Sequence, residues 1–505
     1  MVHRGGRAPR SARGIRGSRQ AAELAEPVTT AQMAGELVAF DSMALPPTAG
    51  GPAVSSEVIP FAALERALVS EREADGVLAG LRRAGPLALA GLASNAANVI
   101  VTVLVARLLS TREYGGLAQL LSVFLIISMP GSAVLVGVVR RAAAWEVAGR
   151  RDLLRAWAVR LHRLAFACVV GLGAVTFLAQ GTVAHALSLP STAGVFEILT
   201  AGGVWVMVAI DRGLLQSQRA YRKVAGNLLV EGGVRTVLTV GLTLAGLGLA
   251  GAATGILLAE ILGALHVRWL VSRELAPAGS NARSGFSQAV VAERQLRAGA
   301  QQAGQLARDV GTALASLALV ALLQNADLLV LGRRDPGHVG QYAAISVASK
   351  ALVFGALALG GYLLPEAAIR WHRGSHALRQ LGATGLMLAL PALGLLLVSL
   401  AMPGDLLRLV FGARLSGAAP AFATLVGAMI FLSTTVVLTN YLLGVGWRWI
   451  VLILAGGAVL ILALVWRARG VPVATARADL LAQAVLAGVT ATAFTVVHHR
   501  SGRRA

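Results

Sequence analysis

Four charged side chains lie inside long apolar stretches, where a charge is expensive to keep. Lys350 lies about eleven residues into an apolar stretch of roughly 27, or about 16 Å along a helix that rises 1.5 Å per residue. Glu260 is central in a second stretch, and Glu231 and Arg235 are four residues apart in a third, which places them on one helix face. An unpaired charge at membrane depth costs at least a few kcal/mol, so each of these groups must be paired or must face water.

The residue types leave several interpretations open. Lys350 either contacts a substrate or ion in a cavity or forms a structural ion pair. Glu260 can pair with Lys350, can titrate as a proton-coupling site, or can be hydrogen-bonded locally without a functional role. Glu231 and Arg235 can neutralise one another, or Arg235 can present its planar fork to a diphosphate.

Other polar side chains accompany these charges. Asp327 follows Gln324 and Asn325 near the end of an apolar stretch and is either part of a gate or a simple polar cluster at a helix end. Asn95 and Asn98 lie in the first apolar stretch. Their amides can face sugar hydroxyls or can form hydrogen bonds between helices.

Composition places these residues in a membrane. The 505-residue chain is 56% hydrophobic and 14% charged, with a mean hydropathy of +0.70, which is more apolar side chain than a soluble core of this size buries. The formal net charge is +21, but no compact basic domain with interleaved aromatic residues is evident, so nucleic acid is not an expected partner. The sequence predicts an all-α polytopic membrane protein.

About twelve apolar spans have the length needed to cross a bilayer as helices. They lie near residues 87–108, 115–138, 163–186, 194–215, 224–246, 248–269, 309–331, 339–365, 381–402, 417–440, 448–466 and 479–498. Alternate connections hold more than twice as many basic residues as the others, which predicts that both termini are cytoplasmic. The tails, 1–85 and 499–505, are then inside the cell.

The first 85 residues combine an arginine run with an acidic, proline-containing segment, and neither part has an apolar run long enough for a signal peptide. We expect a largely disordered cytoplasmic tail. The alternative is an arm that contacts anionic lipid or a partner enzyme.

A short sequence motif repeats after 225 residues, with Gly115 matching Gly340 and Ala118 matching Ala343. Each copy of the repeat lies at the start of a set of six spans. This predicts two lobes, 86–270 and 309–498, related by an axis along the membrane normal. The segment between them, 271–308, is expected to be a cytoplasmic linker with an amphipathic interfacial helix.

Several chemistries are not expected. Cys168 is the single cysteine, so neither an intrachain disulfide nor a cysteine-based metal site can form, and we predict no metal and no cofactor. The sequence has no phosphate-binding loop of the G-x-x-x-x-G-K-[ST] type. The outside connections are short, which disfavours a membrane glycosyltransferase or ligase, and we expect the protein not to be an enzyme.

One sequence motif is Leu104-Val105-Ala106-Arg107-Leu108-Leu109-Ser110, continued by Glu113-Tyr114-Gly115. It resembles the first hairpin of the bacterial polysaccharide flippases of the Wzx type. These belong to the multidrug/oligosaccharidyl-lipid/polysaccharide exporter (MOP) superfamily. Residues 325–332 with 340–344 and Pro365 resemble the start of the second lobe of that family. Residues 407–418 and 442–446 resemble its later helices.

The resemblance implies a transporter whose two lobes flank a central cavity and alternate between openings on either side of the bacterial plasma membrane. Its substrate would be an oligosaccharide on a polyprenyl diphosphate, for cell-envelope polysaccharide synthesis. Its further partners would be membrane lipid and a polysaccharide polymerase or glycosyltransferases. The nearer rival is an ion-coupled small-molecule or multidrug exporter of the same superfamily.

Overall fold

The computed structural model describes residues 77–147, 151–276, 303–372 and 378–502, and all regular secondary structure in these ranges is helical. The N-terminal half contains α4 (Val77–Leu108), α5 (Thr111–Val147), α6 (Arg151–Leu187), α7 (Val195–Ser217), α8 (Tyr221–Leu242), η2 (Thr243–Leu247) and α9 (Gly248–Glu274). The C-terminal half contains α11 (Ala303–Arg334), α12 (Val339–His372), α13 (Leu378–Ala401), α14 (Pro403–Phe411), η4 (Ala413–Ala418), α15 (Ala419–Gly444), α16 (Ile450–Arg467) and α17 (Pro472–Gly502).

Eleven stretches of the described chain are long and apolar enough to cross a membrane. One of them, Tyr221–Glu274, is 54 residues long and folds back on itself through η2. Gly246 and Gly248 make this turn with φ values of 87° and 53°, which side chains with a Cβ rarely adopt. The two arms then pack so closely that a Cβ on Gly255 would lie 2.5 Å from the Thr239 backbone. With this stretch counted as two helices, the described chain has twelve helices able to cross a membrane, the number predicted, and it is a multi-pass membrane protein.

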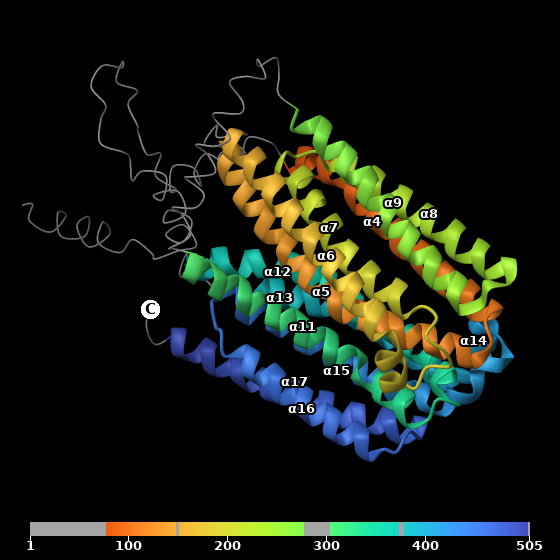
Figure 1. Cartoon of the computed structure of the whole chain (residues 1–505). Coiled ribbons are helices and arrows are strands. Elements are labelled where there is room, and N and C mark those ends of the chain that lie inside the picture. The colour runs from red at the N-terminus through yellow and green to blue at the C-terminus, as the bar shows by residue number, and fades with distance from the viewer. Residues whose placement is uncertain (1–76, 148–150, 277–302, 373–377, 503–505) are drawn as a thin grey trace, which may run out of the picture.

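The helices form two lobes, α4–α9 and α11–α17, whose members pack mainly against one another (Figure 1). Each odd-numbered crossing is connected to the next even-numbered crossing at the same end of the molecule, which we call the joined end. Its connections are residues 109–110, 188–194, 243–247, 335–338, 402–418 and 468–471. At this end α5 packs against α11 and α12, and the end of α4 lies beside α14 (Figure 1).

The repeated glycines lie against each other at the joined end. A Cβ on Gly115 would lie 2.8 Å from the backbone nitrogen of Gly340 and would collide with the Val339 side chain. A Cβ on Gly340 would in turn overlap the carbonyl oxygen of Thr111. Matching positions meet in this way when they lie next to an approximate twofold axis, as expected for two duplicated halves.

Two connections differ from the sequence prediction. The predicted spans leave residues 139–162 as a connection, but α5 continues to Val147 and α6 already begins at Arg151. Contacts between the helix extensions explain this, because Arg151 pairs with Glu146 and the rings of Trp145 and Trp157 pack edge to face at 5.2 Å. The connection between α13 and α15 is likewise helical, with α14 and η4 lying at the joined end.

Some predictions concern residues outside the described ranges. They are the tail up to residue 76, the amphipathic helix of the linker within 277–302, and the last basic residues 503–505.

Candidate functional site

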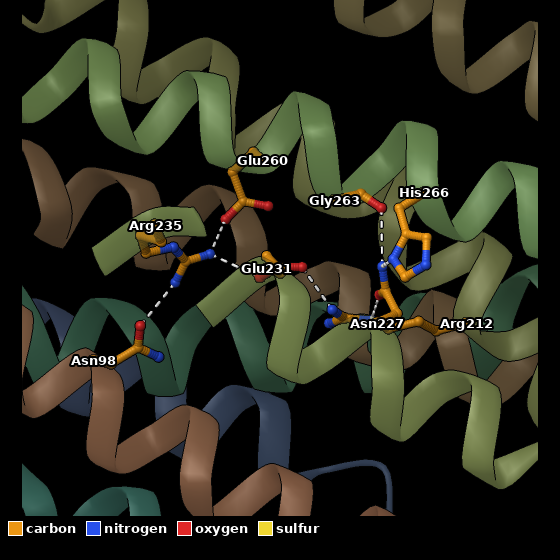
Figure 2. Close-up of polar contacts among 8 residues, drawn as sticks. All are labelled: Asn98, Arg212, Asn227, Glu231, Arg235, Glu260, Gly263 and His266. Atoms are coloured by element: carbon orange, nitrogen blue, oxygen red, sulfur yellow. Dashed lines mark hydrogen bonds and ion pairs between the residues drawn. The ribbon is translucent and has the colours of Figure 1, made fainter. Parts of the chain in front are cut away.

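A buried polar cluster lies inside the N-terminal lobe and is built on one face of α8. Asn227, Glu231 and Arg235 are spaced four residues apart, so successive turns of the helix point them the same way. They face α9, α7 and α4, and Figure 2 shows Arg235 between the amide of Asn98 and the carboxylates of Glu231 and Glu260. We call this group the N-lobe cluster, and its members are Asn98, Arg212, Asn227, Glu231, Arg235 and Glu260.

Arg235 joins three helices. Its Nη1 donates to Asn98 Oδ1 at 3.0 Å, and its Nη2 donates to Glu231 Oε1 at 2.8 Å and also to Glu260 Oε1. The side chain is 16% exposed, while that of Glu260 is fully buried, so Arg235 forms the accessible edge of the cluster.

Glu231 links this edge to a deeper layer. Its second oxygen, Oε2, accepts from Arg212 Nη2 at 2.6 Å, and Arg212 Nε donates to Asn227 Oδ1 at 2.8 Å. Asn227 Nδ2 donates to the Gly263 carbonyl at 3.0 Å and lies 3.4 Å from Nδ1 of His266 (Figure 2). The network therefore fixes the rotation of α7, α8 and α9 about one another.

Gly263 makes room for Glu231. A Cβ at this position would lie 3.0 Å from Glu231 Oε2 and 3.1 Å from its Cγ. The glycine thus allows the carboxylate to lie against the α9 backbone, where it reaches both guanidinium groups.

The charges of the N-lobe cluster balance, because two guanidinium groups face two carboxylates. Two buried atoms nevertheless lack a hydrogen-bond partner among the described residues, Glu260 Oε2 and Arg235 Nε. A paired and hydrogen-bonded network of this kind tolerates burial, whereas the loss of one member leaves an uncompensated charge.

The C-terminal lobe holds a second polar cluster between α11, α12 and α17. Lys350 Nζ donates to Asn325 Oδ1 at 3.1 Å and lies 4.0 Å from Asp327 Oδ1. Tyr342 OH donates to Asp327 Oδ2 at 3.0 Å, and Asn325 Nδ2 donates to the carbonyl of Ala321 at 2.8 Å.

Asp479 and Gln483, from α17, complete a group that we call the C-lobe cluster, and its members are Asn325, Asp327, Lys350, Asp479 and Gln483. Gln483 Nε2 donates to Asp479 Oδ1 and to the carbonyl of Leu323, both at 3.1 Å. Asp479 interacts electrostatically with Asp327 and Lys350. Within the described part of the chain, the buried acceptor oxygens of this region without a hydrogen-bond partner are Asp327 Oδ1, Asp479 Oδ2, Gln483 Oε1 and Gln324 Oε1.

The C-lobe cluster has one more carboxylate than cations. Two aspartates face a single ammonium, and three of the unpartnered oxygens belong to Asp327, Asp479 and Gln483. Oxygen atoms in such surroundings can hold a proton or a small hard cation. No group of three or more His, Cys, Asp or Glu residues suited to a metal ion occurs within the described ranges.

The predicted site residues thus separate into two groups. Asn98, Glu231, Arg235 and Glu260 lie together in the N-terminal lobe, and Asn325, Asp327 and Lys350 lie together in the C-terminal lobe. Asn95 is exposed on α4. The considered pair between Glu260 and Lys350 is wrong, because each of these residues is bonded within its own lobe.

Sequence reasoning missed four members of the clusters. Arg212 falls near the end of a predicted span, but α7 continues to Ser217 and buries it. Asn227 is not among the predicted site residues, although it continues the four-residue spacing of Glu231 and Arg235. Asp479 and Gln483 are also four residues apart in an apolar helix, and this spacing was the available signal.

Comparison with solved structures identifies the fold. No protein-family model matches the sequence, and no curated protein matches it. A multidrug resistance MATE family transporter of the MOP superfamily, solved in an inward-facing conformation, is similar with a TM-score of 0.58 at 13% identity, over 80% of this chain and 96% of that chain. A MATE family transporter of the same superfamily, in an outward-facing conformation, gives a TM-score of 0.52 at 12% identity, over 82% and 95%.

The lipid II flippase MurJ, in an inward closed conformation, gives a TM-score of 0.56 at 10% identity, over 81% of this chain and 87% of that chain. This chain therefore has the fold of the MOP superfamily transporters, and its structural neighbours include both a flippase and multidrug resistance transporters. At these identities the likeness defines the fold and leaves the substrate open.

Proposed function

We propose that this chain is a flippase that moves an oligosaccharide linked to a polyprenyl diphosphate from the inner to the outer leaflet of a bacterial plasma membrane, by alternating access. The fold shared with a lipid II flippase supports the choice of substrate class, and the inward-facing and outward-facing conformations of the MATE neighbours support alternating access. The excess of basic residues on alternate connections supports cytoplasmic termini, so that the joined end faces outward.

The observation that carries this proposal is a polar face on α4 at membrane depth. Asn95 is exposed there, and Asn98, one turn further on, holds the partly exposed guanidinium of Arg235. Both asparagines lie within the candidate span Leu89–Leu108. Because polar side chains are unfavourable in hydrocarbon, this face of α4 is suited to line a water-filled path between the lobes.

The chemistry of this face suits a sugar diphosphate. Amides of the asparagine type donate to and accept from sugar hydroxyls. Arg235 can exchange its Nη1 contact with Asn98 for a phosphate oxygen, while Glu231 and Glu260 keep its Nη2 in place. The polyprenyl tail stays in lipid throughout, so only the polar head needs this path.

The test is the pool of polyprenyl-diphosphate-linked oligosaccharides in the native host, extracted and measured by mass spectrometry. Deletion of the chain should lead to accumulation of one completed repeat unit, and the wild type should clear it. Arg235→Gln should fail to clear it, whereas Arg222→Gln, a matched change at an exposed arginine at the start of α8, should behave as wild type. An unchanged pool in the deletion strain would contradict the proposal.

The C-lobe cluster favours a second candidate, an ion-coupled exporter of small molecules. Its surplus carboxylate can hold a coupling ion, and the MATE neighbours are multidrug transporters. For this candidate, deletion should raise cellular accumulation of a cationic dye, and Asp479→Asn should reproduce the deletion. An unchanged lipid-linked pool together with raised dye accumulation would place this function first.

A further inference from the structure

Two arginine contacts hold the lobes together at the joined end. Arg107 is in the last turn of α4. Its Nε donates to the carbonyl oxygen of Val410 at 3.0 Å, and its Nη2 donates to that of Leu409. Both acceptors belong to the last turn of α14, in the opposite lobe. The carbonyl oxygen of Arg107 itself accepts from Arg414 Nη2 at 2.8 Å.

The second contact runs in the reverse direction. Arg333 is in the last turn of α11. Its Nη1 donates to the carbonyl oxygen of His185 at 2.5 Å and to Ser188 Oγ at 3.1 Å. His185 is in the last turn of α6, in the opposite lobe. The carbonyl oxygen of Arg333 accepts from Ser188 Oγ at 3.4 Å.

The two contacts follow one scheme. In each, an arginine in the last turn of a lobe's first crossing donates to the backbone at a helix end of the other lobe. For Arg333 this helix is α6, the third crossing of the N-terminal lobe. For Arg107 it is α14, the short helix that follows the third crossing of the C-terminal lobe. In each, the receiving segment donates back to the backbone carbonyl of that arginine. The paired glycines Gly115 and Gly340 lie at the same end. The two contacts are therefore related by the same approximate twofold symmetry as the lobes.

We propose that these paired contacts, the Arg107 clasp and the Arg333 clasp, form a reversible latch that closes the joined end and releases when this end opens. The proposal rests on the alternating movement proposed above but not on the identity of the substrate.

The chemistry of the clasps suits repeated release. Their acceptors are helix-end carbonyls and a hydroxyl, with no carboxylate among them, and helix C-termini attract a cation through their dipole. Both arginines are exposed, so water replaces each lost hydrogen bond when the lobes part. The N-lobe cluster differs, because separating its buried ion pairs would leave unpaired charges in the membrane.

The latch can be tested by distance measurements on the full chain in lipid nanodiscs without added substrate. In a Cys168→Ser background, spin labels are placed at Thr192→Cys and Ala413→Cys, two exposed positions on opposite lobes at the joined end. Pulsed electron paramagnetic resonance then reports the ratio of short to long distances. Arg107→Ala and Arg333→Ala should each shift this ratio toward long distances by about fivefold, and the double variant by about 25-fold.

Arg112→Ala is the matched control. Arg112 is also exposed and lies in the first turn of α5 at the joined end, but its side chain forms none of the clasp contacts. The substitution should leave the ratio unchanged. A double clasp variant with the parental distribution would overturn the latch, and so would an Arg112→Ala shift as large as that of either clasp variant.

Lysine substitutions separate clasp geometry from loss of charge. Arg107 uses two nitrogens on two successive carbonyls, which a single ammonium cannot reproduce, so Arg107→Lys should behave like Arg107→Ala. Arg333 uses one nitrogen on two acceptors, so Arg333→Lys should retain the parental ratio. Equal effects of the two lysine variants would contradict the assigned contacts.

Because these measurements need no substrate, their failure is distinguishable from an unchanged lipid-linked pool, which would contradict only the proposed flippase function.

Discussion

The two lobes share one fold but differ in the balance between their buried cations and carboxylates. The N-lobe cluster pairs two arginines with two glutamates, and Glu231 alone bonds to both guanidinium groups. The C-lobe cluster sets two aspartates against one lysine, and Asp479 Oδ2 and Gln483 Oε1 have no hydrogen-bond partner within the described chain. A balanced network stabilises one arrangement of helices, whereas an acid surplus requires a further positive charge.

This difference suggests a division of labour. The N-terminal lobe is built to keep its helices fixed around Arg235 and to present one edge of that side chain. In the C-terminal lobe, unpartnered carboxylate oxygens are available to a proton or a small cation. Substitutions in each lobe test this division, and those that remove a buried carboxylate should have the strongest consequences.

Glu231→Gln should be the most damaging change in the N-terminal lobe. It leaves Arg212 without its carboxylate and Arg235 with only one, so the variant should lose about 3–5 kcal/mol of stability. Thermal unfolding in detergent measures this loss. Glu274→Gln, which breaks the more exposed pair with Lys223, should cost at most about 1 kcal/mol and serves as control. Similar melting temperatures for the two variants would contradict a balanced, essential network.

We expect cations to stabilise the wild type and Asp479→Asn to remove this response. A proton or Na⁺ that binds at the C-lobe cluster would stabilise the folded chain, by about 2.7 kcal/mol at a concentration one hundred times the Kd. Melting temperatures measured over NaCl titrations at constant ionic strength, and over a pH series, report this gain. Glu260→Gln should retain the response because it lies in the other lobe. A response that survives in Asp479→Asn would place the cation elsewhere.

Gly263→Ala tests the close approach of α8 and α9. The added methyl group would lie 3.0 Å from Glu231 Oε2, so we expect a loss of about 1–3 kcal/mol from displacement of the carboxylate. Gly233→Ala, on α8, adds a methyl group with no atom within 4 Å and should be neutral or stabilising by up to about 1 kcal/mol. Thermal unfolding of the two variants gives the difference, and equal values would mean that the carboxylate moves freely.

Asn95→Ala should have the smallest effect on stability, within about 0.5 kcal/mol, because the side chain is exposed. It should still slow clearance of the lipid-linked oligosaccharide if the polar face of α4 contacts the sugar. Asn98→Ala should impair both properties, since it removes an acceptor of Arg235. Normal clearance by Asn95→Ala would restrict the path to the Arg235 edge.

Much of the fold follows from the sequence because the bilayer imposes span length and apolar content. The twelve crossings and the two lobes are predictable in this way, and the repeated glycines mark the contact between the halves. The helix extensions around Glu146 and Arg151 are not predictable, because a hydropathy pattern marks only the part of a helix that lies in the hydrocarbon.

The site was only partly predictable. Spacing within one helix reveals pairs such as Glu231 with Arg235, because the geometry is local. The choice of Glu260 and Arg212 as further partners depends on how three helices rotate against one another, which no spacing encodes. The incorrect pair between Glu260 and Lys350 has the same origin, since depth in the membrane says nothing about which helices are neighbours.

The glycine turn between α8 and α9 also bears on how the chain enters the membrane. With Gly246 and Gly248 allowing a tight reversal, the 54-residue stretch can insert as one helical hairpin. Arg235 then meets Glu231 and Glu260 within that hairpin, so its guanidinium can enter the bilayer already paired, with one carboxylate in excess. Arg212, on the preceding helix α7, is synthesised earlier, so the hairpin brings the carboxylate of Glu231 to an arginine that is already in place.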